Sequence, residues 1–321
     1  MEPNNPYQGP RAPVVAQDDI AEVGRARARP LGHGWLWWKQ AWRITVSNWG
    51  QWSLAVLVLM AVLMGISLSS LLVPLLGNLV PALLSPVFAA GVFDLAHRRW
   101  RGEAFEFGNL FAGFSHSTGQ LFLTGVAQMA AQITFFVLIA VLVLLMFGSE
   151  IADLVSAGAL GEDIVAPPDL ANTGMMRVAL AGLIILALML PYAAALWFQL
   201  PLVYLGKRKP FAALWESLVA VAINWLPMLW YGVIPLLLVL VLCVVAALYV
   251  GFVSLVLGQG VLAAILYGVL VLAGIVAMLF LMALCMVSIY TSFRDVFAMD
   301  EPSAKSTAAP AREPDQLSSG S

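Results

Sequence analysis

Asp94 is a carboxylate near the end of a long apolar stretch, where an ionised side chain is costly and normally has a partner. Arg98 follows four residues later, which places both side chains on one face if the segment is helical. This spacing favours a structural ion pair at the membrane boundary. The alternative interpretation is a relay for protons or cations, because carboxylates within membrane spans also serve that purpose.

Three glutamines, Gln128, Gln132 and Gln199, also lie within apolar stretches, and the first two are one helical turn apart. Polar side chains of this kind commonly hydrogen-bond between helices, and each bond contributes about 0.6–2 kcal/mol. They could instead line the path of a solute, but a path for charged cargo normally includes more ionisable groups at mid-depth. We therefore expect these glutamines to join helices.

Two basic clusters are the best candidates for ligand binding. Cations at the level of the lipid headgroups attract anionic lipid by about 1 kcal/mol per residue. The same cations could equally serve only to orient the chain in the membrane. The candidate headgroup contacts are Arg98, Arg99, Arg101, Lys207, Arg208 and Lys209.

Other reactive side chains are scattered. The histidines, His33, His97 and His116, lie tens of residues apart without the paired spacing of a metal-binding helix, and we interpret them as interfacial. Cys243 and Cys285 fall within apolar runs, where a thiol behaves as a small hydrophobic group. The sequence has no Walker loop, no G-x-S-x-G motif and no dinucleotide fingerprint. We therefore expect no catalytic residue, no metal site and no cofactor.

The composition indicates which elements must position these side chains. Of the 321 residues, 61% are apolar and 11% charged, against about 45–50% and about 25% in a soluble domain. With a mean hydropathy of +0.91, this excludes both a soluble globule and disorder over most of the chain. We predict an all-α integral membrane protein, because backbone amides in lipid are satisfied within helices. The predicted transmembrane helices are 53–76, 78–96, 121–147, 178–205, 226–250 and 261–290.

The second stretch is the least certain of these spans. It contains Pro81 and Pro86, and only Gly77 and Asn78 separate it from the first stretch. A tight helical hairpin fits this spacing. A re-entrant segment is the alternative.

The distribution of charge predicts the orientation. With six crossings, every Lys and Arg except Arg177 falls on one side, and an acidic loop, 148–176, falls on the other. By the positive-inside rule, both termini are cytoplasmic and the acidic loop is external.

The membrane domain comprises residues 31–298. The flanking segments, 1–30 and 299–321, are rich in proline or in small and charged residues, and we expect both to be disordered tails. The net charge of −2 gives no reason to expect a nucleic-acid partner.

Aromatic residues at helical spacing precede the first, third and fifth spans, with polar or basic residues between them. Each such segment is typical of an amphipathic helix lying in the headgroup layer. The dipeptide Asn48-Trp49 recurs as Asn224-Trp225, which favours three repeated hairpins, each preceded by an interfacial helix. An aromatic belt that happens to repeat is the alternative. The residues are Trp35, Trp38, Trp42, Val46 and Trp49; Phe107, Leu110, Phe111 and Phe114; and Phe211, Leu214, Trp215, Leu218, Ala222 and Trp225.

Several segments carry a resemblance to a known family. They are HGWLWWKQAW (33–42), VPLLGNLVPALLSPVFAAGVFDLA and NLFAGF within 72–114, WFQLPLVYLGKRKPFAALWESLVAVAINWLPMLWYG (197–232) and YTSFRDVF (290–297). Over about 32–298, the chain resembles an uncharacterised family of Gram-negative multi-pass inner-membrane proteins. It is more distantly similar to the membrane domain of some glycerophosphodiester phosphodiesterases. The resemblance implies a polytopic inner-membrane protein and supplies no catalytic residues. The long proline-rich amino-terminal tail and the lengthened acidic loop depart from the family pattern.

The sequence thus predicts a non-catalytic component of the bacterial inner membrane that organises lipid or partner proteins. Its expected partners are membrane lipids, in particular anionic ones, and no particular protein partner is indicated. A transporter or channel for a small solute or lipid is the alternative. An enzyme acting on a lipid headgroup is the third hypothesis. It would need an acid and a base at one depth, for which the nearby cytoplasmic carboxylates are Asp94, Glu103, Glu106 and Glu216.

Overall fold

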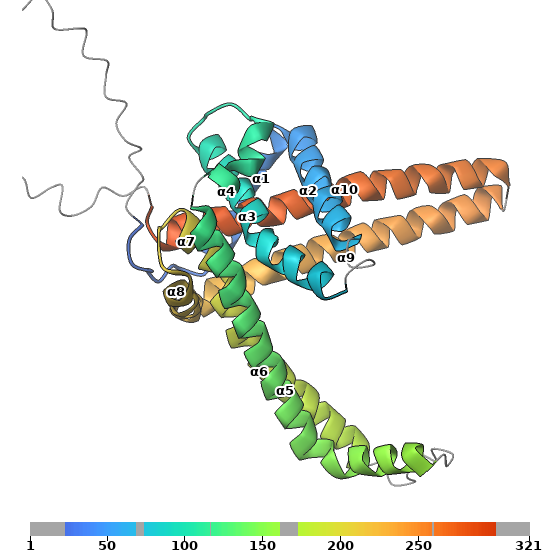
Figure 1. Cartoon of the computed structure of the whole chain (residues 1–321). Coiled ribbons are helices and arrows are strands. Elements are labelled where there is room, and N and C mark those ends of the chain that lie inside the picture. Colours follow the sequence, from blue (N-terminus) through green and yellow to red (C-terminus); the bar gives the residue numbers. More distant parts are fainter. Residues whose placement is uncertain (1–22, 69–73, 116, 161–172, 259, 300–321) are drawn as a thin grey trace, which may run out of the picture.

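The computed structural model describes residues 23–68, 74–115, 117–160, 173–258 and 260–299, and all regular structure in these ranges is helical. Figure 1 shows a packed body from which helical hairpins extend. The elements are α1 (His33–Val46), α2 (Trp49–Leu68), α3 (Pro74–Trp100), the 3-10 helix η2 (Phe107–Phe111), α4 (Ala112–Ser115), α5 (Thr118–Leu160), α6 (Thr173–Trp197), α7 (Gln199–Tyr204), α8 (Pro210–Ile223), α9 (Trp225–Leu257) and α10 (Val261–Val296).

Six of these helical segments are long and apolar enough to cross a membrane, which confirms the predicted all-α, six-helix architecture. The helix α3 is continuous through Pro81 and Pro86 and has the length of a crossing. The candidate spans are Trp49–Leu68, Leu79–Trp100, Thr118–Asp153, Gly174–Tyr204, Trp225–Leu257 and Val261–Val296.

The molecule divides into a base and two arms. The base contains α1, α2, α3, η2, α4, α7, α8 and the last four turns of α10, and its core includes Trp37, Trp52, Phe198, Tyr290 and Phe293, each no more than 1% exposed. The α5–α6 arm and the α9–α10 arm leave the base in different directions (Figure 1). Their outer surfaces are covered with exposed Leu, Val, Ile and Phe side chains.

The helix α10 begins in the exposed α9–α10 arm and ends in the buried base. From Val261 to Met282 most of its residues are exposed, and from Ala283 to Val296 most are buried in the base. At 1.5 Å per residue the exposed part is roughly 33 Å long. That length is close to the hydrocarbon thickness of a bilayer, about 30 Å.

Two glycines allow the backbones of the base to meet. A Cβ atom on Gly91 of α3 would overlap the carbonyl oxygen of Leu110, and one on Gly113 of α4 would overlap the carbonyl oxygen of Val87. Only hydrogen atoms fit at these contacts. The segment before the third span therefore forms a 3-10 helix and a single α-helical turn instead of one regular amphipathic helix.

The predicted disorder extends too far at the amino terminus. Residues 23–30 have no regular structure, but they form an ordered strap against the base: Gly24 N–H donates to Phe297 O at 3.1 Å and Arg27 N–H donates to Val296 O at 2.9 Å. These backbone partners compensate for the low hydrophobicity of the strap. Residues 1–22 and 300–321 of the predicted tails lie outside the described residues, and Met299 is buried.

Part of the predicted acidic loop is helical. Phe147, where the third span was predicted to end, is a kink with φ −132° and ψ 16°, and the chain then continues as a helix to Leu160. Residues 149–160 alternate polar residues with Ile, Leu, Val and Ala, a composition that supports further helical turns. Residues 161–172 of the loop lie outside the described residues.

Candidate functional site

Asp94 is paired as the helical spacing indicates. Arg98 Nε lies 2.7 Å from Asp94 Oδ2, and the hydroxyl of Tyr204 donates to Asp94 Oδ1 at 3.1 Å. The side chain of Asp94 is 15% exposed, so both carboxylate oxygens are satisfied by protein groups in a nearly dry site. The pair ties the end of α3 to the end of α7.

The arginines of the first basic cluster face one acidic neighbour. Arg98 Nη1 lies 3.2 Å and Arg101 Nε 3.4 Å from the carboxylate of Glu103. Arg99 Nη1 donates to the carbonyl oxygen of Glu103 at 2.6 Å. Gly102, with φ +82°, provides the left-handed turn that brings Glu103 back toward these arginines. The three predicted headgroup contacts at the end of α3 therefore already have partners within the chain.

The second basic cluster is more open. Arg208 pairs with Glu216 of α8 at 3.3 Å and donates to Val23 O of the strap at 3.3 Å. Lys207 and Lys209 on either side are exposed and have no ion-pair partner among the described residues. These two lysines are the predicted headgroup contacts that remain available for an external anion.

The three glutamines occupy different environments. Gln199 is fully buried where the chain bends between α6 and α7, and its Nε2 donates to the carbonyl oxygen of Pro210 at 3.2 Å. Gln199 therefore joins α7 to the start of α8. Gln128 is half-buried and Gln132 exposed on α5, and in the described part of the chain neither makes a side-chain hydrogen bond to another predicted site residue.

Asp295 is a junction that the sequence analysis did not single out. His33 Nδ1 lies 2.7 Å from Asp295 Oδ2, Trp37 Nε1 donates to the same oxygen at 2.8 Å, and Arg29 Nε lies 3.4 Å from Oδ1. The side chain of Asp295 is 16% exposed. A carboxylate at the end of the sixth apolar stretch, like Asp94 at the end of the second, is the signal that could have identified it.

Asn224 completes this junction from the other side. It is fully buried; its Oδ1 accepts from Arg29 N–H at 2.8 Å, and its Nδ2 donates to Arg27 O at 3.0 Å. The strap is thus held between Asn224, at the junction of α8 and α9, and Asp295, at the end of α10. His97, the second predicted interfacial histidine, lies 3.0 Å from the Tyr290 hydroxyl, and His116 lies outside the described residues.

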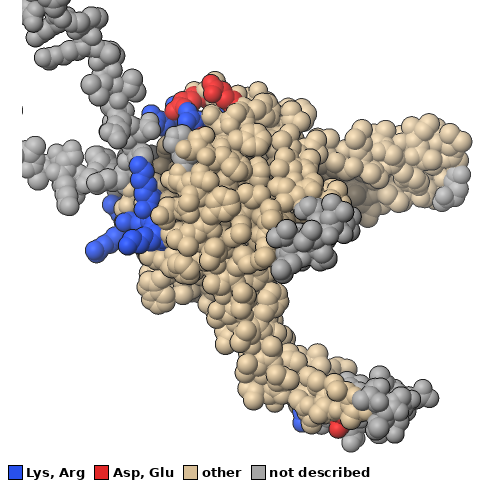
Figure 2. All heavy atoms as spheres, viewed as in Figure 1, with Lys and Arg blue, Asp and Glu red and all other residues tan. Residues whose placement is uncertain are grey.

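Large aromatic side chains remain exposed on the short helices of the base. Trp35 and Trp42 of α1 are 57% and 51% exposed, beside the exposed cations Lys39 and Arg43. Phe211, Trp215 and Trp225 are similarly exposed on α8 and at the start of α9. In Figure 2 the charged residues gather on the base, and a few lie at the tip of the α5–α6 arm, while the visible arm surfaces between them lack charge.

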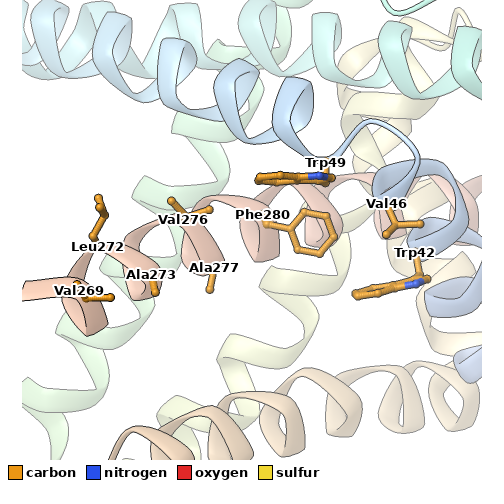
Figure 3. A pocket seen from close by; sticks show the side chains of 9 residues that line it. All are labelled: Trp42, Val46, Trp49, Val269, Leu272, Ala273, Val276, Ala277 and Phe280. Carbon is orange, nitrogen blue, oxygen red and sulfur yellow. The ribbon is translucent and has the colours of Figure 1, made fainter. Parts of the chain in front are cut away.

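An apolar groove runs along α10 next to Trp42 and Trp49. Its volume is about 560 Å³. Figure 3 shows the rings of Trp42, Trp49 and Phe280 at one end and Val269 and Leu272 at the other. No hydrogen-bonding side chain other than the indoles lines it, so it can hold only hydrocarbon. The lining residues are Trp42, Val46, Trp49, Val269, Leu272, Ala273, Val276, Ala277 and Phe280.

Within the described residues, no group of three or more His, Cys, Asp or Glu side chains is arranged to hold a metal ion. The comparisons agree with the membrane assignment. Residues 72–163 match the model of a family described as "Predicted integral membrane protein (DUF2189)". The chain is a multi-pass integral membrane protein. The match begins at Leu72 and includes the segment 72–114 of the sequence resemblance. Neither the curated proteins nor the solved structures contain a match to the chain.

Proposed function

We propose that the protein is a non-catalytic component of the bacterial inner membrane that organises anionic lipid around its base. The observation that carries this proposal is the combination of exposed tryptophans on the short helices α1 and α8 with exposed cations, Lys39 and Arg43 on α1 and Lys207 and Lys209 just before α8. Indole rings favour the boundary between headgroups and hydrocarbon, and cations at that depth attract anionic headgroups.

The internal pairing of the other ionisable groups supports a non-catalytic role. Catalysis on a headgroup requires an acid and a base that can reach the substrate. Asp94 and Asp295 each satisfy arginine or histidine groups of the same chain and are largely enclosed. Such pairs hold helices together, and their partners would have to be removed before either carboxylate could transfer a proton.

The charge distribution supports cytoplasmic termini. Lys207 and Arg177 lie near opposite ends of the candidate span Gly174–Tyr204, and Lys207 belongs to the side that carries nearly all of the bases. The positive-inside rule therefore places the base toward the cytoplasm and the tip of the α5–α6 arm outside. The resemblance to Gram-negative inner-membrane proteins, and the more distant one to phosphodiesterase membrane domains, agree with this location.

Lipid analysis of the purified protein tests the proposal. The variant Lys207→Gln/Lys209→Gln removes two exposed cations that have no ion-pair partner among the described residues, so the phosphatidylglycerol recovered per chain in mild detergent should fall about two- to fivefold. Arg177→Gln, which removes an exposed cation near the opposite end of the candidate span Gly174–Tyr204, is the matched control and should leave the recovery unchanged. Equal recovery from all three proteins would contradict the proposal.

Cysteine labelling tests the orientation separately. Single cysteines at Lys207 and at Met175 should react with a membrane-impermeant maleimide from opposite sides of the membrane in sealed vesicles. Reaction of both positions from the same side would exclude the proposed topology.

A further inference from the structure

The groove along α10 lies directly next to a cationic helix face. Along α10 from its carboxyl end, Asp295 contacts His33, the hydroxyl of Thr291 donates to Trp37 O at 2.9 Å, and Phe280 meets Trp42 edge-on at 5.5 Å. The helix α1 therefore runs antiparallel beside α10.

The chemistry of the surface changes in a fixed order along these two helices. The charged junction at Asp295 is followed by the exposed cation Lys39, and then by the exposed Arg43 at the level of the rings of Trp42 and Phe280. The apolar groove comes last, as far as Val269. Headgroup, interface and hydrocarbon follow one another in the same order in a phospholipid.

The dimensions agree with this order. Phe280 lies near the end of the exposed part of α10, which is about as long as the bilayer core is thick. From Phe280 to Val269 the groove follows α10 for about 16 Å into that core. Its volume of about 560 Å³ is within the range of sites for small hydrophobic ligands, about 300–1,000 Å³.

We propose that this groove is a binding site for one acyl chain of an anionic phospholipid, whose phosphate lies beside Lys39 and Arg43. Ala273 and Ala277, one turn apart on α10, leave the space that the chain occupies, and Trp42 and Trp49 enclose its headgroup end. The inference rests on the proposed function and adds to it a defined site. Charge complementarity selects an anionic lipid as the occupant, because a second copy of the apolar arm would offer no opposite charge to Lys39 or to Arg43, which lies over the ring of Trp100 at 5.6 Å.

Native mass spectrometry of the full chain, released from nanodiscs of equal phosphatidylglycerol and phosphatidylcholine, tests the site. Ala273→Phe and Ala277→Phe fill the groove with a ring, and both positions are exposed, so folding should be unaffected. Each variant should retain at least fivefold less phosphatidylglycerol than the parent. Ala264→Phe, an exposed position of the same helix outside the groove, is the control and should retain as much lipid as the parent.

The variant Lys39→Gln/Arg43→Gln separates the headgroup from the chain. It should retain a lipid but lose the preference for phosphatidylglycerol over phosphatidylcholine. Equal lipid retention by the groove-filling variants overturns the inference, and so does a change from dimer to monomer in those variants, which would identify a second copy as the occupant. If only Lys207→Gln/Lys209→Gln lowers lipid recovery, the groove inference fails while the proposed function stands.

Discussion

The hairpin α2–α3 and the hairpin α9–α10 are both apolar enough to cross a membrane, but α9–α10 is the more apolar of the two and their surroundings differ. Half of the most apolar window of Leu79–Trp100 is buried inside the protein, whereas none of the corresponding window of Trp225–Leu257 is. Of these two hairpins, the more apolar one is exposed outside the base, and the less apolar one is packed against protein. The helices of the base are held together by close backbone contacts, whereas the helices of the arms are stable because lipid surrounds them.

Polar contacts differ between the two regions in the same way. The base joins distant segments through Asp295 and Asn224, whose partners lie more than 190 positions away in the sequence. The described outer part of the α9–α10 arm contains shorter-range bonds, such as the 2.7 Å contact between Ser254 Oγ and Tyr267 OH. We therefore expect substitutions in the base to affect the whole fold and substitutions in the arms to have small, local effects.

The largest difference in stability between the base and the arms is predicted for substitution of glycine by alanine. Gly91→Ala places a methyl group against the carbonyl oxygen of Leu110, and relief requires η2 to move away from α3. Overpacking of this kind costs about 1–3 kcal/mol, and we expect the upper end or more because the obstacle is backbone. Thermal unfolding in detergent, followed by circular dichroism, measures the loss.

Gly268→Ala is the matched control in the α9–α10 arm. Nothing lies within 4 Å of a Cβ atom at this position, so the methyl group should be tolerated and the higher helix propensity of alanine should raise stability by up to about 1 kcal/mol. Equal melting temperatures for Gly91→Ala and Gly268→Ala would show that the base is not packed as described.

The sequence predicts some of these features better than others. The six helices and the Asp94–Arg98 pair follow from local information, because hydropathy and a spacing of four residues are both read within a few turns. The strap 23–30 could not be predicted, since its low hydrophobicity indicates disorder and its partners, Asn224 and Asp295, are almost 200 or more positions away. The contacts of Glu103 with Arg98, Arg99 and Arg101 are local in sequence, but they depend on the left-handed turn at Gly102, which the charge pattern does not reveal.

The repeated dipeptide illustrates the same limit. Asn224 is fully buried and binds the strap, whereas Asn48 is half-buried and its Nδ2 donates to the nearby Gln51 at 2.7 Å. Identical residue types at corresponding positions therefore have different tertiary partners. The sequence repeat predicts where a hairpin begins but not which contacts hold it.

The second prediction compares one carboxylate from each region. Asp295→Ala leaves the indole N–H of Trp37 and the side chains of His33 and Arg29 without their shared acceptor in a site that is largely enclosed. Unsatisfied buried groups cost about 1–3 kcal/mol, so the melting temperature should fall by several degrees. Differential scanning fluorimetry on the purified protein measures the shift.

Glu150→Ala is the control for Asp295→Ala. Glu150 pairs with Arg177 at 2.7 Å near the tip of the α5–α6 arm, where the pair is open to solvent. Exposed ion pairs contribute little to stability. The melting temperature should not change measurably, and a decrease as large as that of Asp295→Ala would remove the distinction between the base and the arms.

The smallest effect is predicted within the α9–α10 arm itself. Ser254 Oγ and Tyr267 OH form a hydrogen bond between the two helices, and the lipid that surrounds the arm also surrounds it when the helices separate. A double-mutant cycle of Ser254→Ala and Tyr267→Phe should therefore give a coupling energy of only about 0.6 kcal/mol. Unfolding in mixed micelles of increasing dodecyl sulfate content measures each corner of the cycle. A coupling energy above about 2 kcal/mol, beyond the range for such bonds in lipid, would mean that the arm is held by specific polar contacts as the base is.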